Sequence, residues 1–268
     1  MQVSQPTRLE GGRRFRAGAG NRPPLVSIIT VVYNAKDELS QLLQAVSALE
    51  SKDFELIVVD GGSQDGTIEL LRDWDDRIDV WLSESDRGIY DAMNKAQRLA
   101  QGVFLYHLNA GDTLFEIPSR ELEEAARQPV DAVTFRVTVD DNREFRPSYG
   151  FMLRIKNTLH HQGTFYRRET FLPYDLQFRI LADFDANQRL AVRGGKVQIC
   201  DRIIAHHVSG GAGDSLNDYR EGFAVVRKNF GPVYVALSHV VNELKGIRLR
   251  RQAALKRWFK KLNRESTS

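Results

Sequence analysis

The amino-acid sequence predicts an α/β fold that is built around a mostly parallel sheet. From residue 25 to residue 112, short apolar runs alternate with helical patterns, and this alternation is typical of βαβ units. The 268 residues, of which 42% are hydrophobic, can bury one large core or two small ones. One domain with two tails is the simpler interpretation. We therefore predict a three-layer α/β/α sandwich over residues 25–232.

The first half of the predicted domain alternates strictly between strands and helices. Its strands are rich in β-branched residues, and its first helix carries an apolar stripe at the spacing of one helical face. The predicted elements are strand Val26–Val32, helix Lys36–Leu49, strand Phe54–Val59, helix Thr67–Trp74, strand Ile78–Leu82, helix Ile89–Ala100 and strand Val103–Leu108. Beyond Asp112 the order is less regular. The elements there are helix Ser119–Arg127, strand Ala132–Val139, strand Gly163–Tyr166, helix Ile180–Val192, strand Val197–Ile204 and helix Asp214–Phe230.

Both tails of the chain are basic, whereas the body between them is acidic. Residues 1–24 hold five arginines, one acid and few large apolar residues, so we predict a disordered basic tail. Residues 233–268 predict a basic amphipathic helix, because nine basic residues and no acid between Lys245 and Arg264 are interleaved with apolar ones. Such a helix fits an anionic membrane surface, and a solvated charged face is the alternative. Since the basic excess lies at the ends, we expect no nucleic-acid partner.

The composition also bears on the compartment in which the protein works. Cys200 is the single cysteine, which excludes an internal disulfide or a cysteine metal cluster and suits a reducing compartment. No apolar run approaches the roughly 18 residues that a membrane-spanning helix needs. The first residues contain arginines but no apolar stretch typical of a secretory signal. We therefore expect a cytoplasmic protein.

Polar side chains follow four successive strands of the predicted sheet, at Tyr33–Asn34, Asp60–Asp65, Ser83–Asp86 and Asn109–Asp112. The carboxyl ends of parallel strands meet at one edge, which is where open α/β sheets bind ligands. At Asp60 a buried strand ends in a carboxylate followed by two glycines, which let a ligand approach the backbone closely. These features predict a nucleotide pocket, although each segment alone is also typical of a simple turn. Neither a P-loop nor a dinucleotide fingerprint is present.

Four segments, in order and at their spacing, resemble one known family. They are Val26-Ser-Ile-Ile-Thr-Val-Val-Tyr-Asn34, Val58-Val-Asp-Gly-Gly-Ser-Gln-Asp-Gly-Thr67, Ser83-Glu-Ser-Asp-Arg-Gly-Ile-Tyr-Asp-Ala-Met-Asn94 and Leu108-Asn-Ala-Gly-Asp112. Together they are similar to the family 2 glycosyltransferases, most of all to bacterial enzymes of exopolysaccharide and lipopolysaccharide synthesis, including the colanic acid type. The resemblance is strong as far as Asp112 and thinner through about His207. It implies a GT-A fold, a Rossmann-like form of the three-layer sandwich.

The resemblance implies a nucleotide-sugar pocket at these strand ends, with UDP as the usual nucleotide. Asp60 would accept a hydrogen bond from the base, and the loop from Thr30 to Asn34 would flank that base. Asp86 and Gly88 would lie along the ribose and the nearby donor. The implied binding residues are Thr30, Val32, Tyr33, Asn34, Asp60, Gly61, Asp86 and Gly88.

The resemblance also implies a divalent cation. Asp112 corresponds to the last acid of the family's Asp-x-Asp region and would hold Mg²⁺ or Mn²⁺ against the diphosphate of the donor. A hard cation prefers carboxylate oxygen and neutralises charge on the leaving group. This chain departs from many relatives, because Asn109, Ala110 and Gly111 precede Asp112 and leave one strong metal ligand. A turn cap before Thr113 is the alternative role of Asp112.

An inverting transfer needs a carboxylate that removes the proton of the attacking hydroxyl. Asp183 and Asp185 are both available, and they should point about 200° apart around a helix. Asp183 matches the family's catalytic acid, so we predict that it is the base; an acid that stabilises a helix N-terminus is the alternative. His161 and Gln162 match a His-Gln segment of this subgroup and would line the donor-sugar or acceptor pocket.

The resemblance thus implies an inverting hexosyltransferase that moves a hexose from a nucleotide diphosphate sugar, with a UDP-sugar favoured, to a lipid-linked saccharide in bacterial polysaccharide synthesis. The enzyme would associate peripherally with the inner membrane, with its basic C-terminal helix on the inner leaflet. Two rival functions are open. A nucleotidyltransferase would need a basic glycine-rich loop near the first strand, which is absent from the sequence. A nucleotide-sugar-binding scaffold without turnover would fit the reduced acid motif at Asp112.

Overall fold

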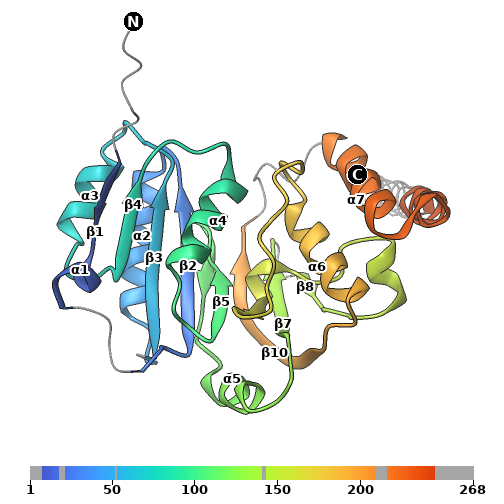
Figure 1. The fold of residues 1–268 in the computed structure, drawn as a ribbon, viewed down its shortest axis with the longest axis horizontal. Coiled ribbons are helices and arrows are strands. Elements are labelled where there is room, and N and C mark those ends of the chain that lie inside the picture. Colours follow the sequence, from blue (N-terminus) through green and yellow to red (C-terminus); the bar gives the residue numbers. More distant parts are fainter. Residues whose placement is uncertain (1–7, 18–21, 52, 141–142, 209–215, 245–268) are drawn as a thin grey trace, which may run out of the picture.

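A mixed sheet organises the described part of the molecule, with helices on both of its faces (Figure 1). The computed structural model describes residues 8–17, 22–51, 53–140, 143–208 and 216–244. Within these residues ten strands join in one sheet, in the order β1-β4-β3-β2-β5-β9-β7-β10-β6, with β8 beside β7. Strands from the first part of the chain therefore lie on one side of the sheet, and strands from the second part lie on the other.

The first half of the sheet has a parallel, deeply buried centre. Its central strands are β2 (Val26–Val32), β3 (Phe54–Asp60), β4 (Val80–Ser83) and β5 (Phe104–His107). All seven residues of β2 are buried, because helices cover both faces of the strand. The parallel register pairs Val32 with Asp60 and Asp60 with Ser83. The polar segments that follow these strands therefore meet at one edge, as the sequence predicts.

The second half of the sheet is mixed in direction. Its strands are β6 (Thr113–Leu114), β7 (Ala132–Val139), β8 (Arg143–Phe145), β9 (Thr164–Arg167) and β10 (Val197–His207). Strand β9 runs antiparallel to both β5 and β7, whereas β7 and β10 are parallel. Two short 3₁₀ turns, η1 (Phe151–Arg154) and η2 (His161–Gly163), precede β9. Because η2 packs against β5, β7 and β10, it lies where the two halves meet.

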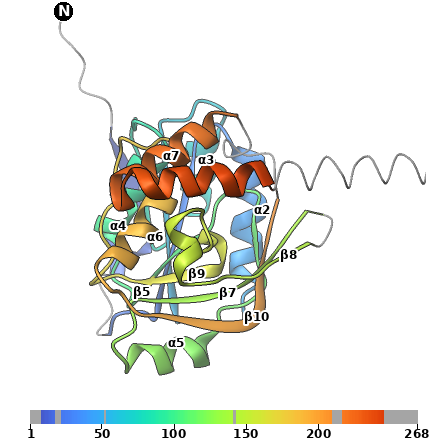
Figure 2. The ribbon, with the colours of Figure 1, turned by 90° about the vertical axis from the view of Figure 1, so that its right-hand side faces the viewer.

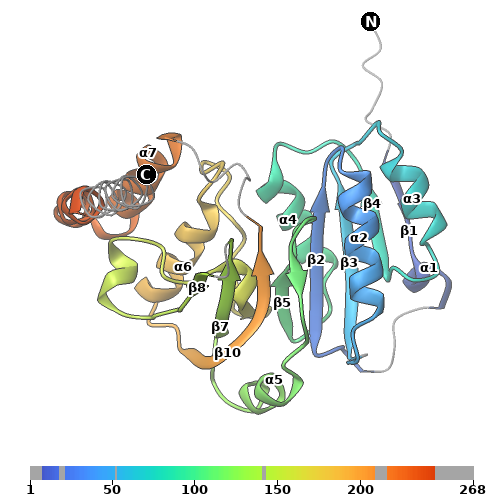
Figure 3. The same ribbon diagram turned by 180° about the vertical axis from the view of Figure 1, so that it is seen from behind.

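Two helical layers complete the sandwich. One apolar core includes α2 (Lys36–Ser47), α3 (Thr67–Asp73) and α5 (Ser119–Ala126), and the other includes α4 (Ile89–Leu99), α6 (Ala182–Val192) and α7 (Leu216–Phe230). Figure 3 shows α2 in front of the sheet, on the face opposite to α4 in Figure 1. The predicted three-layer α/β/α fold is confirmed.

The end of the described chain is helical. Helix α7 packs against α6, and helical residues continue over 232–244 (Figure 2). Among the described residues, none of the helices combines the length and the apolar character that crossing a bilayer requires. The predicted basic helix is thus seen only at its start, and its basic part, residues 245–268, lies outside the described residues.

The prediction that residues 1–24 are disordered is wrong for residues 8–17. Strand β1 (Leu9–Gly11) pairs antiparallel with β4, and α1 (Arg13–Ala17) follows it. Polar contacts hold this arm, since Arg13 pairs with Asp79 at 2.7 Å and Gly12 N–H donates to Asp75. The sequence pattern does not reveal this ordered arm, because backbone pairing and ion pairs stabilise it rather than a buried apolar face. The arm also covers an edge of β4 that would otherwise be open to other chains.

Candidate active site

The loops after β2 and β3 are tied together at the carboxyl edge of the sheet. Asn34 adopts a left-handed conformation (φ 48°), and its N–H donates to Ser63 Oγ, with N and Oγ 2.7 Å apart. Its Oδ1 accepts from Gln64 N–H at 2.9 Å. An asparagine tolerates this backbone conformation better than most residues. Asn34 therefore braces the two loops and holds the preceding Tyr33 at the surface, where that residue is 66% exposed.

The Asp60 carboxylate is hydrogen-bonded within the protein. The residue is completely buried, and its oxygens accept hydrogen bonds from Gly62 N–H, Ser63 N–H, Ser63 Oγ–H and Ser83 Oγ–H. All of these hydrogen bonds come from protein groups, and the expected hydrogen bond from Asp60 to a base stays a prediction. The carboxylate shapes the glycine-rich loop after β3. Thr30 and Val32 are also buried, inside β2, so neither side chain flanks a ligand.

Tyr33, Gly61 and Asp86 lie next to one another beside Asp60. A Cβ atom at Gly61 would lie 2.6 Å from Asp86 Oδ2 and 3.2 Å from Tyr33 Cδ2, so a larger residue at this position would clash with the Asp86 side chain. Asp86 Oδ1 accepts from Gly88 N–H at 2.8 Å, and Gly88, at φ 116°, precedes α4. Tyr33 thus offers an exposed flat ring and Asp86 a partly exposed carboxylate, whereas Gly61 is buried between them. Such groups suit a nucleobase, which stacks on aromatic rings and donates N–H groups.

Asp112 lies in a polar cluster with Gln162 and His207. Gln162 Nε2 donates to Asp112 Oδ2 at 2.6 Å, and His207 Nδ1 lies 2.8 Å from Asp112 Oδ1. Gln162 is completely buried, which corrects the expectation that it lines a substrate pocket. Instead it orients Asp112. His207 was not predicted as a site residue, although its place at the carboxyl end of a strand was a signal that could have identified it.

The donor set at Asp112 fits a divalent cation that is also bound by a substrate. A carboxylate oxygen and an imidazole nitrogen are both ligands of Mn²⁺-like ions, and Gln162 provides the kind of outer hydrogen bond that orients a ligating carboxylate. In the part of the chain that the structure describes, no three His, Cys, Asp or Glu side chains are grouped closely enough to hold a metal ion. Remaining ligands would therefore come from a diphosphate or from water.

Asp183 and Asp185 have different surroundings. Asp183 lies in the first turn of α6, where its oxygens contact Tyr90 Oη at 3.2 Å, Asn157 Nδ2 at 3.1 Å and His161 Nδ1 at 3.7 Å. Asp185 is completely buried between Arg189 and Lys228. Asp185 thus joins α6 to α7, while Asp183 faces polar groups from three other parts of the chain.

The environment of Asp183 favours its ionised form. Burial by itself raises the pKa of the Asp183 carboxyl, but contacts with His161, the Phe184 N–H and His160 outweigh it and leave the pKa below its usual value. An ionised carboxylate at neutral pH is what a general base requires.

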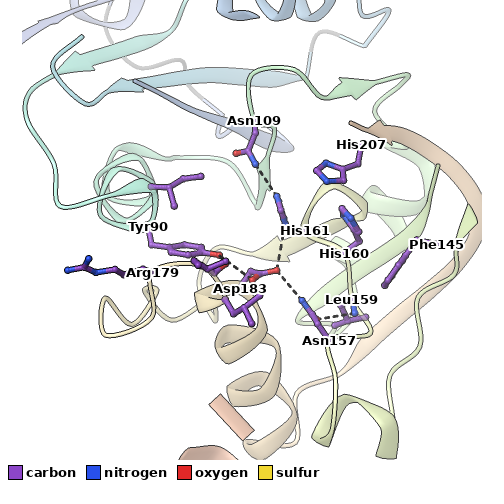
Figure 4. Close-up of a pocket in the computed structure, with 13 residues that line it drawn as sticks. Tyr90, Asn109, Phe145, Asn157, Leu159, His160, His161, Arg179, Asp183 and His207 are labelled. Carbon is purple, nitrogen blue, oxygen red and sulfur yellow. Dashed lines mark hydrogen bonds and ion pairs between the residues drawn. The ribbon is translucent and has the colours of Figure 1, made fainter. Parts of the chain in front are cut away.

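One cavity of about 370 Å³ connects these groups (Figure 4). Asp183, His161, Asn109 and His207 all line it, and Asp112 contacts this lining through His207. The remaining lining residues are Ile89, Tyr90, Phe145, Asn157, Leu159, His160, Arg179, Ile180 and Leu181. Asp183 and His207, the hydrogen-bond partner of Asp112, therefore line one cavity, whereas Asp60 is buried outside it. The roles of Asp112 and Asp183 stay predictions.

Comparison with known proteins identifies the family. Residues 27–189 match the family model for glycosyl transferase family 2. The chain belongs to this family. The PGL/p-HBAD biosynthesis glycosyltransferase of Mycobacterium bovis is 34% identical over 178 residues, which cover 62% of this chain and 69% of the relative. The putative teichuronic acid biosynthesis glycosyltransferase TuaG of Bacillus subtilis is 38% identical over 95 residues, which cover 34% of this chain and 38% of the relative.

Solved structures of other glycosyltransferases share the GT-A fold. TarS 1–349 of S. aureus in complex with UDP superposes with a TM-score of 0.57 at 14% identity over 76% of this chain. The match spans 64% of the TarS chain, which is less than two thirds of it. The mannosyltransferase PcManGT of Pyrobaculum calidifontis, in complex with GDP-Man and Mn²⁺, gives a TM-score of 0.58 at 18% identity over 82% of this chain and 70% of its own. The predictions of a GT-A fold and of a family 2 glycosyltransferase are confirmed.

Proposed function

We propose that this protein is an inverting glycosyltransferase that moves a hexose from a UDP-sugar to a lipid-linked saccharide. The observation that carries the proposal is that Asp183 and His207 line one cavity, with His207 Nδ1 2.8 Å from Asp112 Oδ1. A carboxylate and a cation-binding pair are the two groups that an inverting transfer needs.

The donor nucleotide is assigned to the surface at Tyr33 and Asp86. The exposed Tyr33 ring would stack on the base, and Asp86 Oδ2 would accept an N–H of that base. Uracil presents an imino N–H for this purpose, which supports a UDP-sugar. Among the structural neighbours, TarS binds UDP, whereas PcManGT binds GDP-Man. The diphosphate would then extend toward Asp112.

Asp183 would act as the general base of the transfer. Its ionised carboxylate accepts the proton of the acceptor hydroxyl while that oxygen attacks the anomeric carbon from the face opposite the diphosphate. Tyr90 and Asn157 hold the carboxylate in place through their hydrogen bonds. A cation held by Asp112 and His207 would neutralise charge on the departing diphosphate.

A lipid-linked acceptor and a site at the inner membrane complete the proposal. The nine basic residues between Lys245 and Arg264 suit an anionic lipid surface. The names of two relatives place them in the biosynthesis of PGL/p-HBAD and of teichuronic acid. These names support a role in making a cell-envelope glycan.

The proposal is tested by following UDP release from a panel of UDP-sugars, with and without Mn²⁺, in the presence of lipid-linked saccharides. We expect release that depends on Mn²⁺ and acceptor and that falls sharply in Asp183→Asn. The anomeric configuration of the product, measured by NMR, should be opposite to that of the donor. Donor binding without turnover under any condition would favour the scaffold, and pyrophosphate release from a nucleoside triphosphate would favour the nucleotidyltransferase.

A further inference from the structure

Asn109 makes a contact that the proposed transfer does not explain. It lies just after β5, where its Nδ2 is 3.1 Å from His161 Nε2. The other ring nitrogen of His161, Nδ1, is 3.7 Å from Asp183 Oδ2 (Figure 4). The three side chains therefore form a line from the end of β5 through η2 to the first turn of α6.

The order of the atoms along this line restricts where hydrogens can lie. A neutral imidazole has one nitrogen that donates and one that accepts. Because Nδ1 faces a carboxylate, the hydrogen belongs on Nδ1, and Nε2 is then the acceptor. The Nδ2 group of Asn109 supplies the donor that this acceptor needs. With the amide reversed, an oxygen would face the Nε2 lone pair.

We propose that Asn109 is a positioning residue that holds His161 in its Nδ1–H tautomer, with that N–H directed at Asp183. The inference rests on the proposed role of Asp183 as the base. An Asn side chain suits the task because it is uncharged and can donate. An Asp at the same position accepts only, so it would place the hydrogen on Nε2.

A histidine side chain that is free in water has no neighbouring group that would place its hydrogen on Nδ1, so the tautomer of His161 depends on its partners. If His161 turned its lone pair toward Asp183, two acceptors would face each other and the carboxylate would lose a donor. The other titratable or charged groups around His161 come from several elements. They are His107 of β5, Tyr90 of α4, His160 beside η2, Arg179 before α6 and His207 of β10.

The experiment reads the tautomer directly, by two-bond ¹H–¹⁵N correlation spectra of ¹⁵N-histidine-labelled full-length protein at neutral pH. We expect His161 to carry its hydrogen on Nδ1 in the wild type and to shift toward Nε2–H in Asn109→Ala. Asn109→Asp, which can only accept, should likewise move the hydrogen to Nε2. Asn157→Ala is the matched control, because Asn157 is a second cavity amide whose Nδ2 donates to Asp183 rather than to an imidazole. It should leave the His161 tautomer unchanged.

The kinetic consequence is a second readout. In Asn109→Ala we expect kcat to fall about tenfold, the size of one lost hydrogen bond, with the KM for the donor within about twofold of the wild type. An Nε2–H tautomer in the wild type, or an unchanged tautomer in Asn109→Ala, would overturn the inference. If the tautomers behave as expected but no variant transfers sugar, the proposed function fails while the positioning by Asn109 stands.

Discussion

The parallel half of the sheet and the mixed half build their parts of the site in different ways. In the parallel half, each site residue directly follows a strand, so the parallel pairing of the strands brings the residues together, and contacts such as that of Asn34 with Ser63 join neighbouring strand ends. In the mixed half, the site is assembled from distant segments: Asn157 and Asp183 are 26 positions apart, and Asp112 and His207 are 95 apart. Short motifs therefore encode the donor side of the site, whereas the side that carries the base depends on tertiary packing.

The two halves also divide the chemistry. Under the proposed function, the nucleotide binds at Tyr33 and Asp86 in the parallel half. The proposed base, Asp183, lines the cavity of the mixed half together with His207, the partner of Asp112. Variants in the two halves should therefore affect different steps, and their effects can be ranked.

The largest effect is expected for Asp183→Asn in the mixed half. Loss of a general base lowers kcat by about 10² to 10⁴-fold, because the acceptor hydroxyl keeps its proton. UDP binding, measured by calorimetry with Mn²⁺, should be unchanged, since Tyr33 and Asp86, which are proposed to bind the nucleotide, lie in the other half. A variant that transfers sugar at the wild-type rate would remove Asp183 from the mechanism.

Gln162→Ala tests the contact that joins the halves at Asp112. Removing the hydrogen bond that orients a ligating carboxylate should weaken the apparent affinity for Mn²⁺ by about 10 to 100-fold. The measurement is the Mn²⁺ dependence of UDP release, with the exposed Gln177→Ala as the control. If both variants show the same Mn²⁺ dependence as the wild type, Asp112 does not bind the metal in the proposed way.

His107 at the junction of the halves should make stability depend on pH. Burial, with the nearby His161, lowers the pKa of His107 from 6.5 to about 3. Between these values the unfolded chain binds a proton that the folded protein does not, so the free energy of unfolding falls as the pH decreases from 6.5. From pH 7 to pH 5 the loss is about 2 kcal/mol.

Urea denaturation at the two pH values measures this loss. In His107→Gln the decrease between pH 7 and pH 5 should be smaller by about 2 kcal/mol, because the titrating group is gone. An identical decrease in the variant and the wild type would show that His107 is protonated as easily in the folded protein as in the unfolded chain.

The smallest effect is expected in the parallel half, for Tyr33→Ala. Loss of stacking on one base should raise the Kd for UDP about tenfold, while kcat at saturating donor stays close to the wild-type value. Tyr33→Phe keeps the ring and should bind UDP normally. Equal affinities of the Ala variant and the wild type would place the base elsewhere.

Much of the fold follows from local patterns in the sequence. Strands β2 and β7 have the predicted bounds, because each is a run of buried β-branched residues that ends at a polar segment. Strand β1 was missed because its three residues are stabilised by pairing with residues of β4 that lie 70 to 74 positions away. Local composition carries no signal for such a partner.

The candidate site was predicted less completely than the fold. Asp183 and Asp112 are recognisable from their segments, but the burial of Asp60 depends partly on Ser83, which is 23 positions away. His161 and Gln162 are adjacent in the sequence yet contact different acids, Asp183 and Asp112 respectively. Sequence spacing does not reveal which way each side chain points.

The proposed mechanism requires that a cation-bound UDP diphosphate at Asp112 and the base at Asp183 share one cavity. Paramagnetic broadening of histidine ring signals by Mn²⁺ in the presence of UDP tests this requirement. We expect the signals of His207 and His161, which both line the cavity, to broaden together when both Mn²⁺ and UDP are present. Binding of Mn²⁺ and UDP that leaves both signals sharp would contradict the shared cavity.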